Sequence, residues 1–105
     1  MKALEHIEEM TMYEFKLYVV GQTPKSQTVI YELTKLLKDA FDDHYNLEVI
    51  DIIENPERTD QDKILATPTL EKVSPEPVRR IVGDLSDKEM VLPALGLTPQ
   101  EENKQ

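Results

Sequence analysis

The chain has 105 residues but contains no cysteine, only three glycines and no long apolar run. Without cysteine, disulfides, thiolate catalysis and cysteine-ligated metals are excluded. No glycine-rich loop could hold a phosphate group, so no cofactor is expected. No apolar run approaches the ~20 residues that a membrane-spanning helix needs, and the N-terminus lacks the apolar core of a signal peptide. These absences predict a soluble, cytoplasmic protein with one domain.

Side chains that could carry out catalysis or bind a metal are few and scattered. His6 and His44 are the only histidines, and their spacing is not that of metal ligands. Ser26 could act as a nucleophile only beside a base, and no histidine lies near it in the sequence. Helix capping is the favoured role for this serine. The sequence therefore predicts no enzyme and no metal site.

Negative charge dominates the composition, with a formal net charge of −9. Residues 39–62 form an acidic window that holds nine acidic side chains and a single base, Arg58. Such a field repels nucleic acid and anionic membranes, so neither is expected as a partner. Two interpretations remain open for this window. It is either a solvated face that maintains solubility or a surface complementary to a basic partner.

The hydrophobic pattern predicts four strands and three helices in the order βαβαββα. The predicted strands are 13–20, 45–53, 69–73 and 78–82. The first predicted helix runs from residue 24 to about residue 43, and the second runs from residue 56 to about residue 65. The third helix opens after Ser86. The predicted domain covers residues 12–97, between a flexible extension at 1–11 and a flexible acidic tail at 98–105.

Proline and polar caps set the expected helix boundaries. Thr23-Pro24 and Asn55-Pro56 each combine a capping residue with a proline at the first helical position. Ser86 and Glu89 have the spacing of a capping box. In the short second helix, the apolar pair Ile64-Leu65 is expected to be buried.

The stretch from Asp62 to Asp84 contains the features that indicate the fold class most clearly. Its Thr67-Pro68 bond leads directly into an apolar strand and is expected to be cis. Ser74–Pro77 can only be a turn, because its prolines lack the N–H groups that pair one strand with the next. Gly83-Asp84 is expected to end the strand that follows. A cis proline, a hairpin and a closing helix are typical of a thioredoxin-like α/β domain with a mixed four-stranded sheet. The loop at 21–26 lacks the Cys-x-x-Cys of redox members, so redox chemistry is excluded.

Arg79 and Arg80 are the only adjacent arginines in the chain. Neighbouring residues on a strand point to opposite faces, so at most one of the two can face the core. Two interpretations remain open. Either one arginine pairs with the acidic face formed by the acidic window while the other is solvated, or the pair contacts a partner near the hairpin edge.

Most of the chain, from Tyr13 to Leu97, resembles the KaiB family of circadian clock proteins. The matching segments are 16–19, 21–26, 49–51, 55–56, 62–70 and 77–86. The resemblance implies a non-enzymatic regulator that docks on the ring ATPase KaiC, with a KaiA-like protein or a sensor histidine kinase as further partners. It also implies a metamorphic chain whose resting form has the order βαββααβ, and a homo-oligomer, dimer or tetramer.

The resemblance also implies a docking face on the first helix and second strand. The family has an arginine where this chain has Thr28 and a lysine where it has Glu48, so two positive charges are lost. The other candidate positions on or beside this face are Tyr13, Asn46, Lys63 and Arg79. The family's long acidic C-terminal tail is shortened. These departures are typical of a divergent homologue with a role in stress or signalling.

The family usually has glycine where this chain has Ala94, which favours the helical form of the last segment by ~1 kcal/mol. Pro93 is expected to kink or end that helix near Leu92. Two functions therefore compete. One is a regulator that docks on a KaiC-type ATPase in circadian or stress-response signalling. The other is a thioredoxin-fold interaction or sensor module for another partner, such as a histidine kinase.

Overall fold

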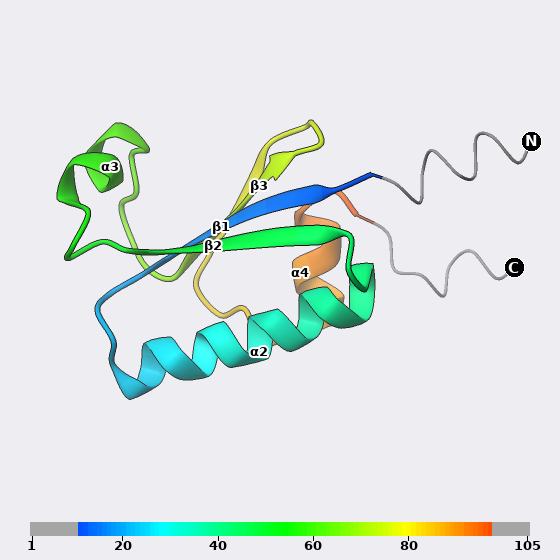
Figure 1. The fold of residues 1–105 in the computed structure, drawn as a ribbon, viewed down its shortest axis with the longest axis horizontal. Helices are drawn as coiled ribbons and strands as arrows, with labels where there is room; N and C mark the ends of the chain where they lie inside the picture. Colours follow the sequence, from blue (N-terminus) through cyan, green and yellow to red (C-terminus); the bar gives the residue numbers. More distant parts are fainter. Residues whose placement is uncertain (1–10, 98–105) are drawn as a thin grey trace, which may run out of the picture.

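The computed structural model describes residues 11–97, drawn in Figure 1. The elements follow one another as β1 (Tyr13–Val19), α2 (Pro24–Phe41), β2 (Tyr45–Asp51), α3 (Pro56–Gln61), β3 (Thr69–Ser74), β4 (Arg79–Val82) and α4 (Lys88–Ala94). This order confirms the predicted βαβαββα arrangement. The extension at 1–10 and the tail at 98–105, both expected to be flexible, lie outside the described residues.

The four strands form one mixed sheet in the order β2-β1-β3-β4. β1 pairs with β2 in parallel, as a βαβ crossover requires, whereas β3 runs antiparallel to both β1 and β4. In this register Leu17 stands between Val49 and Leu70. β2 and β4 are therefore the edges of the sheet.

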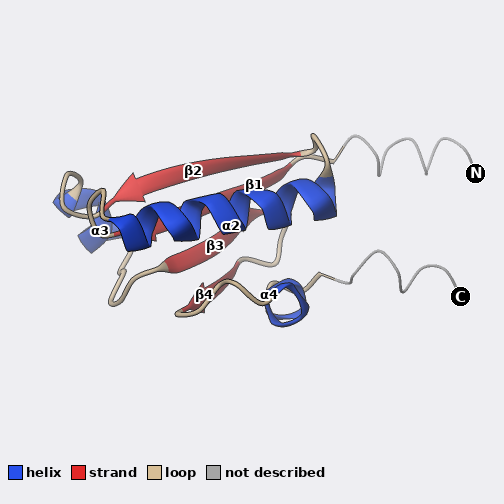
Figure 2. Cartoon of the chain, turned by 90° about the horizontal axis from the view of Figure 1, so that it is seen from below, coloured by secondary structure: helices blue, strands red, loops and turns tan. Residues whose placement is uncertain are grey.

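The hydrophobic core lies between the sheet and the two helices α2 and α4, which cover the same face (Figure 2). Phe15, Leu17 and Val19 alternate along β1 and all enter this core. α2 contributes Leu33 and Leu37, which share one side of the helix because they are four residues apart. The opposite face of the sheet is left for polar side chains and for α3.

The N-terminus of α2 forms as the capping signal predicts. Thr23 has an extended backbone, and its hydroxyl oxygen accepts the amide N–H of Ser26 at 3.1 Å. The Ser26 hydroxyl is buried and donates to the Val20 carbonyl at 3.0 Å. Ser26 therefore ties the helix start to the end of β1, whereas the capping side chain is that of Thr23, which corrects the capping role favoured for Ser26 from the sequence.

The segment after β2 differs from the prediction. β2 ends at Asp51, two residues earlier than expected. The Asp51 carboxylate accepts the amides of Gly21 and Ile53 at 2.8 and 2.9 Å, which turns the chain out of the sheet. α3 ends at Gln61, before the expected apolar pair, because Lys63 has a φ of 57° that no helix continues. Leu65 is consequently 96% exposed instead of buried.

Prolines shape both ends of β3. The Thr67-Pro68 peptide bond is cis, as predicted, and so are the bonds before Pro75 and Pro77.

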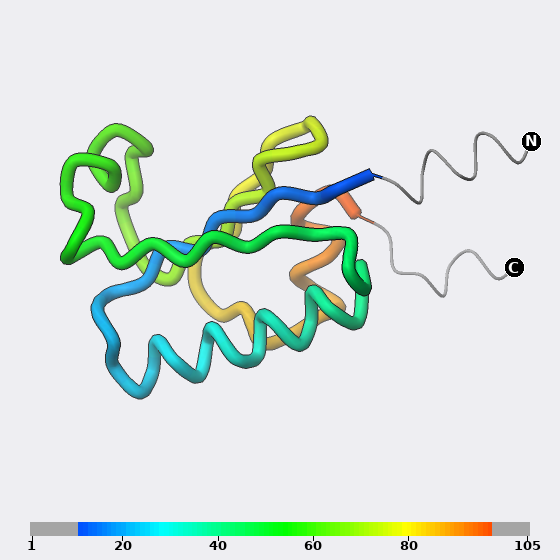
Figure 3. The backbone as a smooth tube through the Cα atoms, viewed as in Figure 1, coloured from blue at the N-terminus to red at the C-terminus, as the bar shows by residue number. Residues whose placement is uncertain are grey.

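The two connections on either side of β3 lie at opposite ends of the sheet. Figure 3 shows the segment that contains α3 at the end of the sheet where β1 and β2 finish. The β3–β4 turn lies at the other end, since Ser74 pairs with Glu14 near the start of β1.

A buried lysine holds the β3–β4 turn in place. Lys72 is only 2% exposed, and its ammonium donates to the carbonyl of Pro77 at 2.7 Å and also to the carbonyl of Pro75. Burial, with a further contribution from the charge of Arg79, lowers the pKa of Lys72. One side chain thus satisfies two carbonyls of a turn that has few amide donors of its own.

The last helix begins and ends slightly later than predicted. Its cap is Asp87, whose carboxylate accepts the amide of Glu89 at 3.0 Å. Ser86 instead donates its hydroxyl to Asp84, so the expected capping box does not form. Pro93 lies inside the helix, which continues to Ala94 instead of ending near Leu92. In a helix this short, proline removes only one backbone hydrogen bond. The amide of Leu95, just after the helix, donates to the Val91 carbonyl.

Among residues 11–97, no helix combines the length and the apolar character needed to cross a membrane.

Candidate functional site

The face of the sheet opposite α2 and α4 carries half of the candidate residues. Residues of even number in β1 and β2 point to this face, which we call the open face, because their odd neighbours enter the core. Asn46 and Glu48 in β2 are exposed there, and the Asn46 amide donates to the Glu14 carboxylate at 3.2 Å. α3 and the turn after it lie over one end of this face.

Glu48 is held by the single base of the acidic window. Arg58 in α3 donates two hydrogen bonds to the Glu48 carboxylate, at 2.7 and 2.8 Å. These bonds lower the pKa of Glu48 and raise the pKa of Arg58. The two charges cancel locally, so Glu48 forms an ion pair and does not present a free negative charge.

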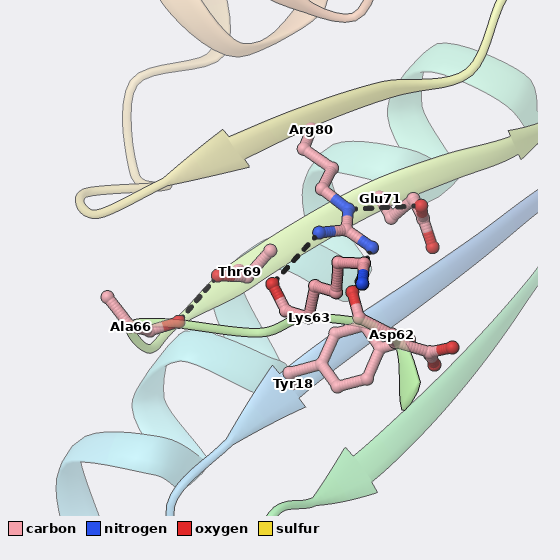
Figure 4. A network of polar contacts seen from close by, with 7 residues as sticks. All are labelled: Tyr18, Asp62, Lys63, Ala66, Thr69, Glu71 and Arg80. Carbon is pink, nitrogen blue, oxygen red and sulfur yellow. Dashed lines mark hydrogen bonds and ion pairs between the residues drawn. The ribbon is translucent and has the colours of Figure 1, made fainter. Parts of the chain in front are cut away.

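A second polar network ties the turn after α3 to the sheet (Figure 4). Tyr18 is fully buried and donates its hydroxyl to the Asp62 carboxylate at 2.5 Å. Burial, followed by this hydrogen bond, raises the pKa of Tyr18 well above its ordinary range. Arg80 in β4 donates to the carbonyls of Asp62 and Lys63 and pairs with Glu71 at 3.1 Å. The Lys63 side chain in the same turn is exposed.

The remaining candidates lie elsewhere. Thr28 is exposed on α2, in the layer that covers the other face of the sheet. Tyr13 is half-buried at the start of β1, with its ring centroid 4.4 Å from that of Phe41. Arg79 lies beside the end of α4, where a Cβ added to Gly96 would come within 3.6 Å of its Nε. Three of the six candidates, Asn46, Glu48 and Lys63, therefore share the open face, and three do not.

Of the two arginines, Arg80 is paired and Arg79 is not paired with any acidic side chain of the described chain. The acidic partner of Arg80 is Glu71, directly opposite it in the hairpin, and not a carboxylate of the acidic window. One arginine is therefore paired and the other is exposed, but the expected pairing with the acidic face is wrong, because the partner lies across the hairpin.

The positions expected to be structural form the connection from β4 to α4. Gly83 has a φ of 109°, a conformation that favours glycine, and its amide donates to the Pro68 carbonyl. The Asp84 carboxylate accepts both the amide and the hydroxyl of Ser86, which lowers the pKa of Asp84. Ala94 is the last residue of α4 and is exposed.

Sequence reasoning missed the residues that build the open face. Alternation along the first strand places Tyr18 on the face opposite Phe15, Leu17 and Val19, but it does not predict the hydrogen bond to Asp62. Arg58 was noted only as a lone base, and Glu71 was not singled out. The signal that could have identified Glu71 is the register of the hairpin, which sets it opposite Arg80.

The fold resembles thioredoxin-like structures. The N-terminal domain of SasA from Synechococcus elongatus superposes with a TM-score of 0.65 at 23% identity, covering 75% of this chain and 76% of that one. Chloroplastic thioredoxin z gives the same TM-score at 19% identity, with 90% and 86% covered. At these identities the likeness concerns the fold alone. The chain is a thioredoxin-like domain without cysteine.

Comparison of the amino-acid sequence identifies the family, which the likeness of the fold does not. The KaiB domain model matches residues 16–97. The circadian clock oscillator protein KaiB of Rippkaea orientalis is 52% identical over 89 residues, which cover 85% of this chain and 86% of that protein. The protein of the same name from Trichodesmium erythraeum is 50% identical over 92 residues, or 88% of each. The chain belongs to the KaiB family, which confirms the resemblance read from its segments.

Proposed function

We propose that this chain is a non-enzymatic clock regulator that docks on a KaiC-type ring ATPase. The observation that carries the proposal is the 50–52% identity to circadian clock oscillator KaiB proteins over at least 85% of the chain. The absence of cysteine supports a binding role, since thioredoxin-type redox chemistry requires thiols. A KaiA-like protein and a sensor histidine kinase are the further partners that this role would involve.

The docking surface that we propose runs from α2 across the edge strand β2 to the turn after α3. A groove of about 640 Å³ separates α2 from β2. Its lining combines apolar side chains with acidic and amide groups, notably Tyr31, Val49, Asp51 and Glu54. Tyr31 is 65% exposed, and exposed aromatic side chains are enriched where proteins bind one another.

Charge at two positions of this surface would set partner preference. Thr28 and Glu48 replace the two basic residues that the family resemblance implies there. Glu48 already pairs with Arg58, so a lysine at this position would face a like charge. Surface substitutions of this kind rarely change folding stability by more than ~0.5 kcal/mol. Their effect would therefore fall on binding.

The test is binding of the purified chain to the KaiC-type ATPase of its own host and to that of Rippkaea orientalis, by biolayer interferometry. We expect the host ATPase to bind. We expect T28R/E48K to bind the Rippkaea ATPase more tightly than the wild type, with an almost unchanged melting temperature. T28R/E48K/R58Q removes the like charge beside the new lysine and should bind at least as well.

Two outcomes would contradict the proposal. If the wild-type chain binds neither ATPase but binds a histidine kinase of the host, it is an interaction module for that partner. If the double and triple variants bind the Rippkaea ATPase no better than the wild type, the surface of α2 and β2 does not determine partner choice. E89K, which changes the net charge by +2 at an exposed position of α4 away from this surface, is the matched control for charge alone.

A further inference from the structure

The turn after α3, residues 62–65, contains a non-glycine residue in a left-handed conformation at the end of a helix. Lys63 has a φ of 57°, a left-handed conformation that is unfavourable for a residue with a Cβ. Its amide bonds to the Asp60 carbonyl, and the next amide, of Ile64, reaches back to Thr59. A non-glycine residue keeps such a conformation only where its surroundings hold it.

Besides these backbone bonds, Arg80 supplies side-chain contacts that attach this turn to the sheet. Its guanidinium donates to two successive carbonyls, those of Asp62 and Lys63, and to the carboxylate of Glu71 (Figure 4). The Glu71 side chain is only 12% exposed, so the pair anchors Arg80 to the sheet. A planar guanidinium with five donors can reach all three acceptors at once, whereas an ammonium cannot match that geometry.

Tyr18 adds a second attachment from the middle of the sheet. Its hydroxyl donates to the Asp62 carboxylate, while Arg80 takes the Asp62 carbonyl. Asp62 is thus fixed at both its side chain and its backbone. The residue that follows it, Lys63, is left with its ammonium in solvent and without an ion pair among residues 11–97.

We infer that Arg80 is a positioning residue that presents Lys63 to a carboxylate of the partner. The inference rests on the proposed function, because it concerns how the open face engages the ring ATPase. Arg80 does not need to touch the partner. Its role is to keep the Lys63 backbone in one conformation, so that the ammonium meets its acceptor without first ordering the turn.

The first experiment concerns the turn alone and needs no partner. In R80K the ammonium can still pair with Glu71 but cannot hold both carbonyls. We expect amide hydrogen exchange at Lys63 and Ile64 to accelerate about tenfold or more, while the amides of β1 keep their wild-type rates. R79K makes the same chemical change at the neighbouring residue, which has no such bonds, and should leave all these rates unchanged.

The exchange result can overturn the inference in two ways. Unchanged rates at Lys63 and Ile64 in R80K would mean that the guanidinium does not hold the turn. Equal acceleration in β1 and in the turn would mean that R80K weakens the whole fold, so that no local positioning role exists.

The second experiment is a double-mutant cycle on binding to the host ATPase, with K63M, R80K and K63M/R80K. We expect K63M and R80K each to weaken binding by about tenfold, the loss typical of an important interface residue. The double variant should bind like K63M alone, because Arg80 acts through Lys63. K63R keeps the charge and should retain most of the affinity.

Independent losses that multiply in the double variant would overturn the inference, as would wild-type affinity of K63M. A wild-type chain that does not bind the ATPase would contradict the proposed function and with it the presentation of Lys63 to that partner. The exchange experiment would then still decide whether Arg80 holds the turn, so the two failures can be told apart.

Discussion

Replacing Lys72 by methionine tests the most unusual buried group of the fold. The lysine is 2% exposed in β3, and its ammonium is bonded to the carbonyls of Pro75 and Pro77. Methionine keeps a similar volume and an unbranched stem, so no large cavity forms. What K72M removes is the donor that closes the β3–β4 turn.

The expected loss follows from two opposing terms. A hydrogen bond from a charged donor contributes roughly 1.5–3 kcal/mol, and Lys72 makes two. Against this stands the cost of taking the ammonium out of water, which also lowers the pKa of Lys72. Because Pro77 is exposed, water can replace part of the lost bonding in the variant. We expect K72M to lower the free energy of unfolding by about 2 kcal/mol.

Urea denaturation followed by far-UV circular dichroism measures this quantity directly. For a domain of this size, about 2 kcal/mol corresponds to a melting temperature lower by roughly 8–16 °C. K88M, at an exposed position of α4, controls for the loss of a lysine charge. A loss below about 0.5 kcal/mol in K72M, the range of ordinary surface changes, would refute the reasoning. It would mean that the desolvation cost of the ammonium cancels its two bonds.

Three further predictions concern single side chains. Y18F removes the hydroxyl bonded to Asp62 and should lower the free energy of unfolding by about 1 kcal/mol, whereas Y31F at an exposed ring should have no effect in the same urea titration. Arg58 lowers the pKa of Glu48, so this carboxylate stabilises the fold above its unfolded pKa near 4.5, and that contribution disappears as the pH falls through its lower folded value. E48Q should therefore show a slightly weaker acid dependence of the melting temperature than the wild type, and an identical dependence would contradict the pair. A94G should destabilise the end of α4 by up to ~1 kcal/mol, seen as faster amide exchange at Leu95 and Gly96, and an unchanged exchange rate would show that helix propensity does not matter there.

The fold could be predicted because its signals are local and repeated. Alternation along β1 and the three-four spacing along α2 each involve many residues, so a single misread position changes little. The errors in the prediction lie at the ends of β2 and α3, where a single residue ends the element. Asp51 ends β2 by accepting two amides, and Lys63 ends α3 by its positive φ, and neither event leaves a pattern in the sequence.

The open face was harder to predict because its contacts join distant segments. Tyr18 and Asp62 are separated by 44 residues, and Arg80 reaches across 18 residues to the Asp62 carbonyl. Family resemblance pointed to Lys63 and Glu48 but not to the groups that hold them. Such supporting contacts depend on how the turn after α3 crosses the sheet, which composition and spacing do not specify.

The position of Thr28 and Glu48 limits how any partner can use both. Thr28 is exposed on α2, which covers one face of the sheet, whereas Glu48 is on the open face, and β2 is the edge strand on that side. A partner that contacts both positions therefore has to wrap around the β2 edge and cover the groove between β2 and α2. Such a partner would bury the exposed Val49 on the same strand. Charge at the two positions can then change partner preference while the core, which lies on the inner side of α2, keeps its packing.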